Sequence, residues 1–164
     1  MTAGPPFRDT QEVGLTVNGA PVTATVHARQ LLADFLRDTL DLTGTVVGCE
    51  QGVCGSCTVL LDGLPVRSCL VLTVQAAGSA VTTVEGITPA TGLHPLQRAF
   101  ADHHGLQCGF CTAGFLMTLV AARPEEHPDD EAIRCLLSGN LCRCTGYQKI
   151  VESVRAAWGR DPGG

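Results

Sequence analysis

The sequence predicts an α+β protein in which a small mixed sheet, crossed by one helix, is followed by a bundle of four short helices. Two hairpin turns, Asn18-Gly19 and Asp62-Gly63, stand between alternating apolar residues in the first half of the chain. In the second half the apolar residues recur at three- and four-residue spacing, which indicates helices. Eight of the nine cysteines form two groups of four, one in each half. We therefore predict two small domains, each built around a cysteine quartet.

The first hairpin is predicted from two runs of apolar residues at period two, Val13-Leu15-Val17 and Val22-Ala24-Val26. Apolar residues at helical spacing follow between Leu31 and Leu40, and they predict an amphipathic helix. A Gly-rich stretch, residues 48–57, comes next. Its glycines allow the backbone to turn sharply, so we expect a loop here.

The second hairpin is predicted to join Thr58–Leu61 to Leu64–Ser68. Counting outward from a two-residue turn places Cys57 opposite Ser68, and the chain then returns Cys69 to the Gly-rich loop. A further strand is expected over residues 81–84. A hairpin, a helix, a loop and a second hairpin, in this order, are the pattern of a β-grasp domain.

The second half begins in a stretch rich in Gly, Pro and Thr, residues 86–95, and we place the domain boundary between residues 1–85 and 86–164. The apolar groups beyond it predict four helices, a bundle. We expect the second helix to end before Pro124 and the third to end at Gly139. Asp129 and Asp130 are best explained as caps of the third helix. The groups that mark the helices are Leu96, Ala99 and Phe100; Phe115, Leu116, Leu119 and Val120; Ile133, Leu136 and Leu137; and Ile150, Val151, Val154 and Trp158.

Composition and charge narrow the classes of function. The chain has 164 residues and a net charge of −5, with 45% hydrophobic and 4% aromatic residues. No basic patch with interleaved aromatic residues is present, so nucleic-acid binding is not expected. Residues 1–12 lack the pattern of a signal peptide, and no apolar run reaches transmembrane length. We therefore expect a cytoplasmic protein without direct membrane insertion, whose cysteines bind metal rather than form disulfides.

The first cysteine quartet has the spacing C-x4-C-x2-C, with a fourth cysteine after eleven more residues. This is the plant-type spacing for a [2Fe–2S] cluster. Glycines in the loop, Gly48, Gly52 and Gly55, are expected to let the backbone aim N–H groups at sulfur. Ser56 and Thr58 either donate to sulfur as well or are ordinary turn residues. The four predicted ligands are Cys49, Cys54, Cys57 and Cys69.

The second quartet consists of a C-x2-C pair, Cys108 and Cys111, and a C-x-C pair, Cys142 and Cys144. The first pair precedes a predicted helix, whose positive dipole end favours thiolates. The second pair lies in a short link between helices, where alternate residues of an extended chain point the same way. This spacing fits a second iron–sulfur cluster, and it also fits one zinc ion with four cysteine ligands.

Three motifs together carry a family resemblance. The chain resembles the small iron–sulfur subunit of the molybdenum hydroxylases, a family that includes xanthine dehydrogenase, aldehyde oxidoreductase, aerobic CO dehydrogenase and bacterial N-heterocycle or aryl-CoA hydroxylases. The likeness runs from about Val13 to Trp158, and all eight ligand positions match in order. The motifs are Gly48-Cys-Glu-Gln-Gly-Val-Cys-Gly-Ser-Cys57, Gln107-Cys-Gly-Phe-Cys-Thr-Ala-Gly114 and Ser138-Gly-Asn-Leu-Cys-Arg-Cys-Thr-Gly-Tyr147.

The resemblance implies a plant-ferredoxin-like domain and a four-helix domain, each with a [2Fe–2S] cluster. It implies a large partner subunit that holds molybdopterin, expected as the cytosine dinucleotide, and a medium subunit that holds FAD, with the three chains arranged as a dimer of heterotrimers. Electrons would pass from molybdenum to the second quartet's cluster, the proximal one, then to the first quartet's distal cluster, then to FAD. By the same resemblance, Gln107 and the backbone around Cys108 would contact the pterin.

Two departures from the family pattern stand out. Ala113 occupies a position where the family usually has proline, which would preset the first helical turn. Alanine is a good helix former, so the helix is still expected. The loop sequence of residues 50–53 differs from that associated with true CO dehydrogenases, which weakens the specific assignment to CO oxidation.

Several residues near the quartets have simpler explanations. Cys135 shares a predicted helix with apolar residues and is expected to be a buried small hydrophobic residue rather than a ninth ligand. His103 and His104 are not expected to be Rieske-type ligands, because the quartet is complete without them. Arg143 either raises the potential of a cluster by its charge or pairs with a carboxylate on a partner. Without the resemblance, Gln107 would be explained as a helix cap.

The sequence thus predicts the electron-transfer subunit of a molybdopterin-dependent hydroxylase, part of a heterotrimer. The chain shows no nucleophile–base pair, nucleotide-binding motif or oxyanion-stabilising device, so none of its residues is expected to act on substrate. The alternative from another class is a stand-alone two-cluster ferredoxin or redox sensor. The third hypothesis is a zinc-stabilised interaction module, because the spacing of the second quartet also fits a zinc ion.

Overall fold

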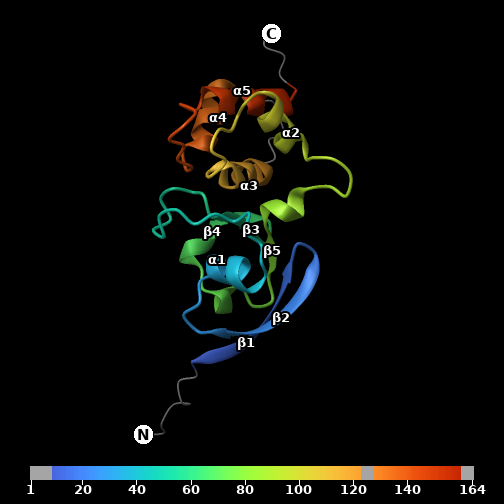
Figure 1. The fold of residues 1–164 in the computed structure, drawn as a ribbon, viewed down its shortest axis with the longest axis vertical. Helices are drawn as coiled ribbons and strands as arrows, with labels where there is room; N and C mark the ends of the chain where they lie inside the picture. Colours follow the sequence, from blue (N-terminus) through green and yellow to red (C-terminus); the bar gives the residue numbers. More distant parts are fainter. Residues whose placement is uncertain (1–8, 123–127, 160–164) are drawn as a thin grey trace, which may run out of the picture.

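The computed structural model describes residues 9–122 and 128–159, which form a mixed sheet at one end and helices at the other (Figure 1). In the described residues the strands lie in the order β2-β1-β5-β3-β4. Neighbouring strands are antiparallel except β1 and β5, which are parallel. The predicted α+β class is therefore confirmed. The strands are β1 (Thr10–Val17), β2 (Ala20–His27), β3 (Thr58–Leu61), β4 (Leu64–Arg67) and β5 (Ala80–Thr82).

Both predicted hairpins are present, and each has a two-residue turn. Asn18 and Gly19 have φ of 50° and 83°, and Asp62 and Gly63 have φ of 51° and 83°. Two successive positive φ angles define the turn type whose twist matches that of the flanking strands, which explains the Asn-Gly and Asp-Gly sequences.

The second hairpin has the predicted register. Leu61 lies opposite Leu64, and the Ser68 N–H donates to the Cys57 carbonyl at 3.2 Å. Cys69, the next residue, lies in a short 3₁₀ turn, Ser68–Leu70, and is buried. The hairpin therefore brings Cys69 back to the loop that carries the other three cysteines of the first quartet.

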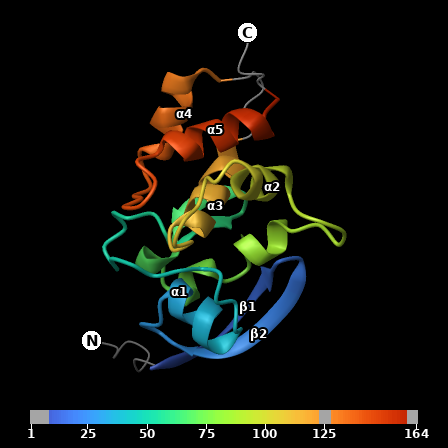
Figure 2. The same ribbon diagram turned by 45° about the horizontal axis from the view of Figure 1, so that its top comes forward.

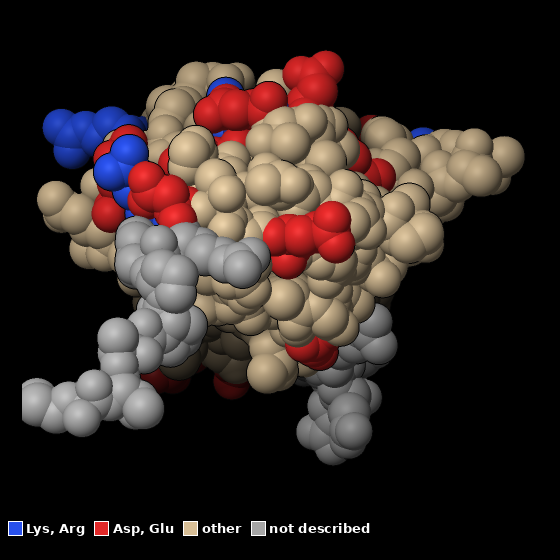
Figure 3. Space-filling model, turned by 90° about the horizontal axis from the view of Figure 1, so that it is seen from below, with Lys and Arg blue, Asp and Glu red and all other residues tan. Residues whose placement is uncertain are grey.

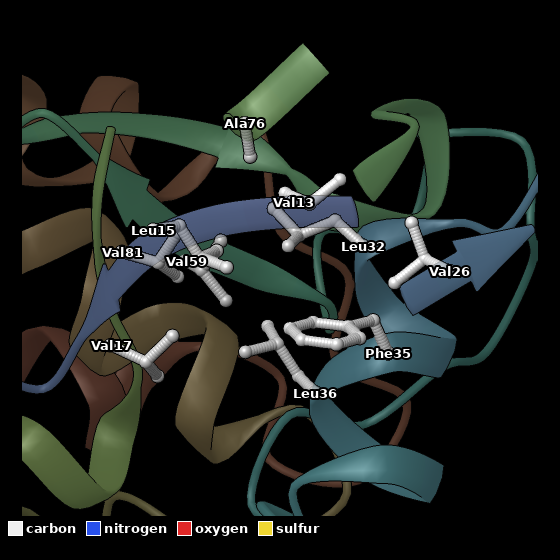
Figure 4. Packing of buried hydrophobic residues seen from close by; sticks show 10 residues of the cluster. All are labelled: Val13, Leu15, Val17, Val26, Leu32, Phe35, Leu36, Val59, Ala76 and Val81. Atoms are coloured by element: carbon white, nitrogen blue, oxygen red, sulfur yellow. The ribbon is translucent and has the colours of Figure 1, made fainter. Parts of the chain in front are cut away.

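The predicted first helix packs across the sheet. It begins as α1 (Leu32–Asp34) and continues as a π-helical turn over Phe35–Thr39. Phe35 and Leu36 point from this helix toward the strand residues, as Figure 4 shows. The resulting core consists of Val13, Leu15, Val17, Val26, Leu32, Phe35, Leu36, Val59, Ala76 and Val81.

The last strand is shorter than predicted. β5 ends at Thr82, and Val84 already begins a 3₁₀ turn, Val84–Ile87. The reason is that a side chain replaces the strand ladder at Thr83. Asn18 accepts the Thr83 N–H at 2.9 Å and donates to the Thr83 hydroxyl at 3.0 Å. Because these bonds satisfy the backbone at this point, the chain can leave the sheet here.

Beyond the sheet, the four predicted helices are all found in the described residues (Figure 2). Ala113 lies in the first turn of the second of them, as expected. The predicted end of that helix before Pro124 falls outside the described residues. The helices are α2 (Pro95–Asp102), α3 (Thr112–Ala122), α4 (Asp130–Leu137) and α5 (Gln148–Ala157). Their shared core consists of Leu96, Phe100, Phe115, Leu116, Leu119, Ile133, Leu137, Ile150, Val151 and Val154.

The start of α4 follows only part of the prediction. Asp129 is the N-cap, and its carboxylate accepts the Ala132 N–H at 2.8 Å. Asp130 instead pairs with the Arg155 guanidinium of α5, and this ion pair ties the two helices together. Asp129 is thus the N-cap, and Asp130, in the first turn of the helix, is an interhelical partner.

The sheet end of the molecule, seen from below in Figure 3, has a mostly neutral surface with scattered acidic side chains. The basic groups visible in this view lie at its rim. None of the helices in the described residues combines the length and apolar character needed to cross a membrane.

Candidate metal centres

The first quartet is built on the loop before β3 and on the turn after β4. Cys57 and Cys69 are buried, and Cys49 and Cys54 are partly exposed. The backbone N–H groups of Cys54 and Gln51 both lie 3.4 Å from Cys49 Sγ. These N–H groups, that of Cys54 first, lower the pKa of Cys49 to about 6. The loop therefore stabilises a thiolate, the form of cysteine that binds metal.

The other two sulfurs of this quartet lie together on the protein side of the loop. Burial raises the pKa of Cys69 to about 11, and a hydrogen bond with the Cys57 side chain adds to this shift. A hydrogen bond from the Gly52 backbone N–H lowers the pKa of Cys69 and so partly offsets this shift. The raised pKa keeps the Cys69 thiol protonated when no metal is bound, so a bound cation is what Cys69 requires to become a thiolate.

Two of the three loop glycines have the positive φ that glycine adopts readily, and the third bends the chain without one. Gly52 and Gly55 have φ of 74° and 77°. Gly48 lacks a positive φ, but the chain does bend at this residue. Glycine is also required there for space, because a Cβ would lie 3.0 Å from Phe110 Cε1 and 3.3 Å from Cys54 Sγ.

The second quartet also divides into two pairs of sulfurs. Cys108 Sγ and Cys144 Sγ are 3.5 Å apart, and both residues are exposed. Cys111 and Cys142 form the other pair. Burial, followed by the Cys142 side chain, raises the pKa of Cys111 to about 12. Burial alone would raise the pKa of Cys142, but hydrogen bonds from Thr145 and the backbone lower it.

Tyr147 organises the link that carries Cys142 and Cys144, a role that the sequence did not reveal. Its hydroxyl accepts the Cys142 N–H at 3.0 Å, and its backbone has a φ of 69°. Its ring meets the Phe115 ring edge-on, with centroids 6.2 Å apart. The only signal in the sequence was its place at the end of the third motif.

A cavity of about 430 Å³ lies between the two quartets. Arg143 and Phe110 line this cavity, and so does Ser56, the candidate donor to sulfur. The Thr58 hydroxyl points elsewhere, because it donates to the Gly55 carbonyl at 2.5 Å. The cysteines that line the cavity are Cys49, Cys54, Cys108, Cys111 and Cys144.

The sulfur arrangement can be tested against the two candidate metals. Among residues 9–122 and 128–159, no group of three or more His, Cys, Asp or Glu side chains is gathered around a single ion position. The sulfurs instead meet two by two in both quartets: Cys49 with Cys54 and Cys57 with Cys69 in the first, and Cys108 with Cys144 and Cys111 with Cys142 in the second. A [2Fe–2S] cluster has two irons, each taking two of the four protein ligands. Two pairs of thiols per quartet therefore fit a two-iron cluster better than one tetrahedral zinc ion.

The structure does not support a metal-ligand role for the residues outside the quartets, and it corrects the prediction made for Cys135. Cys135 is exposed, so the prediction that it is buried is wrong. α4 buries Ile133 and Leu137, and a residue two positions after Ile133 is turned by about 200° around the helix axis. His103 lines a separate depression with Arg98. Gln107 is exposed beside Cys108.

Two family models match adjacent parts of the chain. The "2Fe-2S iron-sulfur cluster binding domain" matches residues 15–81, and the "[2Fe-2S] binding domain" matches residues 83–155. The first match contains the first quartet, and the second match contains the second quartet.

The chain is similar to curated proteins over most of its length. It is 59% identical to the 6-hydroxypseudooxynicotine dehydrogenase complex subunit beta of Paenarthrobacter nicotinovorans, covering 90% of this chain and 91% of that protein. It is 56% identical to the caffeine dehydrogenase subunit gamma of Pseudomonas sp. strain CBB1, covering 88% and 89%. It is 54% identical to the nicotine 6-hydroxylase small subunit of Paenarthrobacter nicotinovorans, covering 93% and 92%.

Solved structures share the fold. A chain of quinoline 2-oxidoreductase from Pseudomonas putida 86 superposes with a TM-score of 0.87 at 47% identity, covering 92% of this chain and 95% of that chain. Aldehyde oxidoreductase from Desulfovibrio gigas superposes with a TM-score of 0.84 at 42% identity, covering 93% of this chain and 18% of that chain.

Proposed function

The chain belongs to the small iron–sulfur subunits of the molybdenum hydroxylase family, and we propose that it relays electrons from a molybdenum centre through its two [2Fe–2S] clusters to FAD on a partner subunit. The observation that carries this proposal is that the cysteine sulfurs meet in pairs within two separate quartets, with a cavity between the quartets. When bound, such clusters pass electrons one at a time.

We propose one cluster on the first quartet, with Cys49 and Cys54 on one iron and Cys57 and Cys69 on the other. The structure supports this division because Cys69 meets Cys57, while the Cys54 N–H meets Cys49 Sγ. The N–H groups that reach Cys49 stabilise negative charge on sulfur, and such bonds help to set a cluster's potential. These backbone contacts are the chain's own contribution to the redox site.

The second cluster is proposed to bind the other quartet, with Cys108 and Cys144 on one iron and Cys111 and Cys142 on the other. The first of these pairs is exposed and the second is partly buried. An exposed pair next to exposed Gln107 is what the proximal position requires, because the partner's pterin must come close. This exposure supports the proposed order, with molybdenum feeding the second quartet's cluster first.

The fold and its division are proposed on the same basis. Residues 1–85 correspond to a plant-ferredoxin-like β-grasp domain and residues 86–164 to a four-helix domain. Separate apolar cores on the two sides of this boundary support the division, as do two family models that meet near residue 82.

The partners are proposed to be a large molybdopterin-binding subunit and a medium FAD-binding subunit, in a cytoplasmic dimer of heterotrimers. Exposed apolar side chains near the two cysteine loops are suited to such partners. Val53 and Leu70 are 62% and 60% exposed near the first quartet, and Phe110 and Leu141 are 49% and 51% exposed near the second. Nicotine, caffeine and quinoline, which occur in the relatives' names, are nitrogen heterocycles, so we propose a substrate of this class for the large subunit.

Rapid mixing of the purified complex with substrate tests the relay. We expect Cys54→Ser to leave molybdenum reduction intact and to block reduction of FAD. Cys142→Ser should block transfer out of molybdenum, and loss of a ligand should also destabilise the helical domain. Flavin reduction at the normal rate in the Cys54→Ser complex would show that the order is wrong. Isolation of the wild-type chain alone, coloured and reversibly reducible, would favour a stand-alone two-cluster ferredoxin.

A further inference from the structure

One backbone carbonyl of the first cysteine loop collects three hydrogen bonds. Gly55 O lies between the ligands Cys54 and Cys57 and accepts from the Thr58 N–H at 3.2 Å and the Thr58 hydroxyl at 2.5 Å. Its third donor comes from the other half of the chain, because Asn140 Nδ2 lies 3.0 Å away. The first cluster loop is therefore held from outside its own domain.

Asn140 is placed to connect the two cysteine quartets. Asn140 is 1% exposed, and it stands two positions before Cys142. The Thr118 hydroxyl of α3 donates to Asn140 Oδ1 at 2.9 Å, so both ends of the buried amide are occupied. A buried amide without partners would be costly, so these bonds define one orientation of the side chain.

A second hydrogen bond runs directly between the two ligand-bearing segments. The Leu141 N–H donates to the Cys54 carbonyl at 2.9 Å. Leu141 is bonded covalently to Cys142, so one hydrogen bond and a few covalent bonds join a ligand of one quartet to a ligand of the other. We name residues 139–141 the bridging segment.

The bridging segment and the first loop touch without room for adjustment. A Cβ on Gly55 would lie 2.5 Å from Asn140 Nδ2 and 2.6 Å from the Gly139 carbonyl oxygen. The Arg67 guanidinium of β4 holds the same segment from its exposed side, donating to the Gly139 carbonyl at 2.5 Å. The spacing between the quartets is therefore set by direct backbone and amide contacts.

We propose that Asn140 is a positioning residue for electron transfer between the two clusters, which it holds at one distance and orientation through Gly55 and the bridging segment. This inference rests on the proposed function. In the step concerned, one electron leaves the second quartet's cluster and reduces the first quartet's cluster, and no bond forms or breaks. Because transfer between centres depends on their geometry, the residue acts through the loop and touches neither cluster.

The test is made in the purified complex with the variant Asn140→Leu, which keeps the approximate size and adds no charge. Thr118→Val is the second variant, because it removes the hydroxyl that orients the amide. Thr73→Val is the matched control: Thr73 is also buried, and its hydroxyl donates to the Gln30 carbonyl at 3.0 Å, inside the first domain. The readouts are iron content, the magnetic interaction between the two reduced clusters in electron paramagnetic resonance, and the rates of molybdenum and flavin reduction.

We expect Asn140→Leu to retain both clusters and normal molybdenum reduction, but to lose or weaken the magnetic splitting and to slow flavin reduction. Thr118→Val should shift both quantities in the same direction, and Thr73→Val should match the wild type. An unchanged splitting and flavin rate in Asn140→Leu would overturn the proposal. If Asn140→Leu does not assemble, an unchanged splitting in Thr118→Val overturns it. A wild-type complex without two cluster signals would instead refute the proposed function.

Discussion

Replacing Gly114 by alanine tests how closely the helical domain packs on the first cysteine loop. Gly114 lies in the first turn of α3, where alanine in place of glycine normally stabilises a helix by about 1 kcal/mol. Here, however, the added Cβ would press against the Gly55 carbonyl oxygen and lie 2.9 Å from Ser56 Cα. Carbon atoms normally pack at roughly 3.5–4.0 Å, so the backbones must separate by roughly 0.5–1 Å.

The expected result is a net loss of stability in spite of the better helix former. Overpacking of this kind costs about 1–3 kcal/mol, and it exceeds the gain in helix propensity when the obstacle is backbone that cannot rotate away. At about 2–4 °C per kcal/mol for a chain of this size, we expect the Gly114→Ala complex to bleach at a temperature several degrees lower. The assay is loss of the visible cluster absorbance at a fixed heating rate.

Gly14→Ala is the control for this experiment. Gly14 lies in β1, has no positive φ, and its nearest atom to an added Cβ is Thr23 Oγ1 at 4.0 Å. The same substitution is therefore expected to be neutral or slightly stabilising there. A Gly114→Ala complex as stable as the wild type, or more stable, would refute the packing argument and leave helix propensity as the dominant effect.

Two further predictions concern single side chains. The Ala80 N–H, 2.7 Å from the carboxylate, lowers the pKa of Asp62 in the folded chain, so its stabilising effect is present above the unfolded pKa of about 3.9 and is lost as the pH falls through the folded pKa. Thermal midpoints of wild type and Asp62→Asn should therefore differ at pH 6, and the difference should shrink as the pH falls below the unfolded pKa of about 3.9; a constant difference would contradict this. Cys135→Ala should leave the iron content and both cluster signals unchanged, because Cys135 lies exposed on α4. Loss of either signal would show that the ligand set is incomplete.

Local patterns predicted most of the elements correctly because each depends on neighbouring residues. Asn18-Gly19 and Asp62-Gly63 can adopt the two positive φ angles of a tight hairpin turn without strain, so the turns could be recognised in the sequence. Asp129 capped its helix as predicted, for the same local reason. The error at Cys135 and the unpredicted packing role of Gly48 have a different origin. Each depends on which face of the chain meets another segment, and Phe110 is far from Gly48 in the sequence.

The sequence by itself determined the two cysteine quartets, the hairpins and helices that carry them, and the resemblance to an electron-relay subunit. These follow from spacing and periodicity, which are properties of short segments. Only the tertiary structure decided which sulfurs pair, and that Asn140, Gly55 and Gly114 join the two halves. The physical reason is that a buried amide, a carbonyl and a missing Cβ acquire a role only when distant segments approach within hydrogen-bond or van der Waals distance.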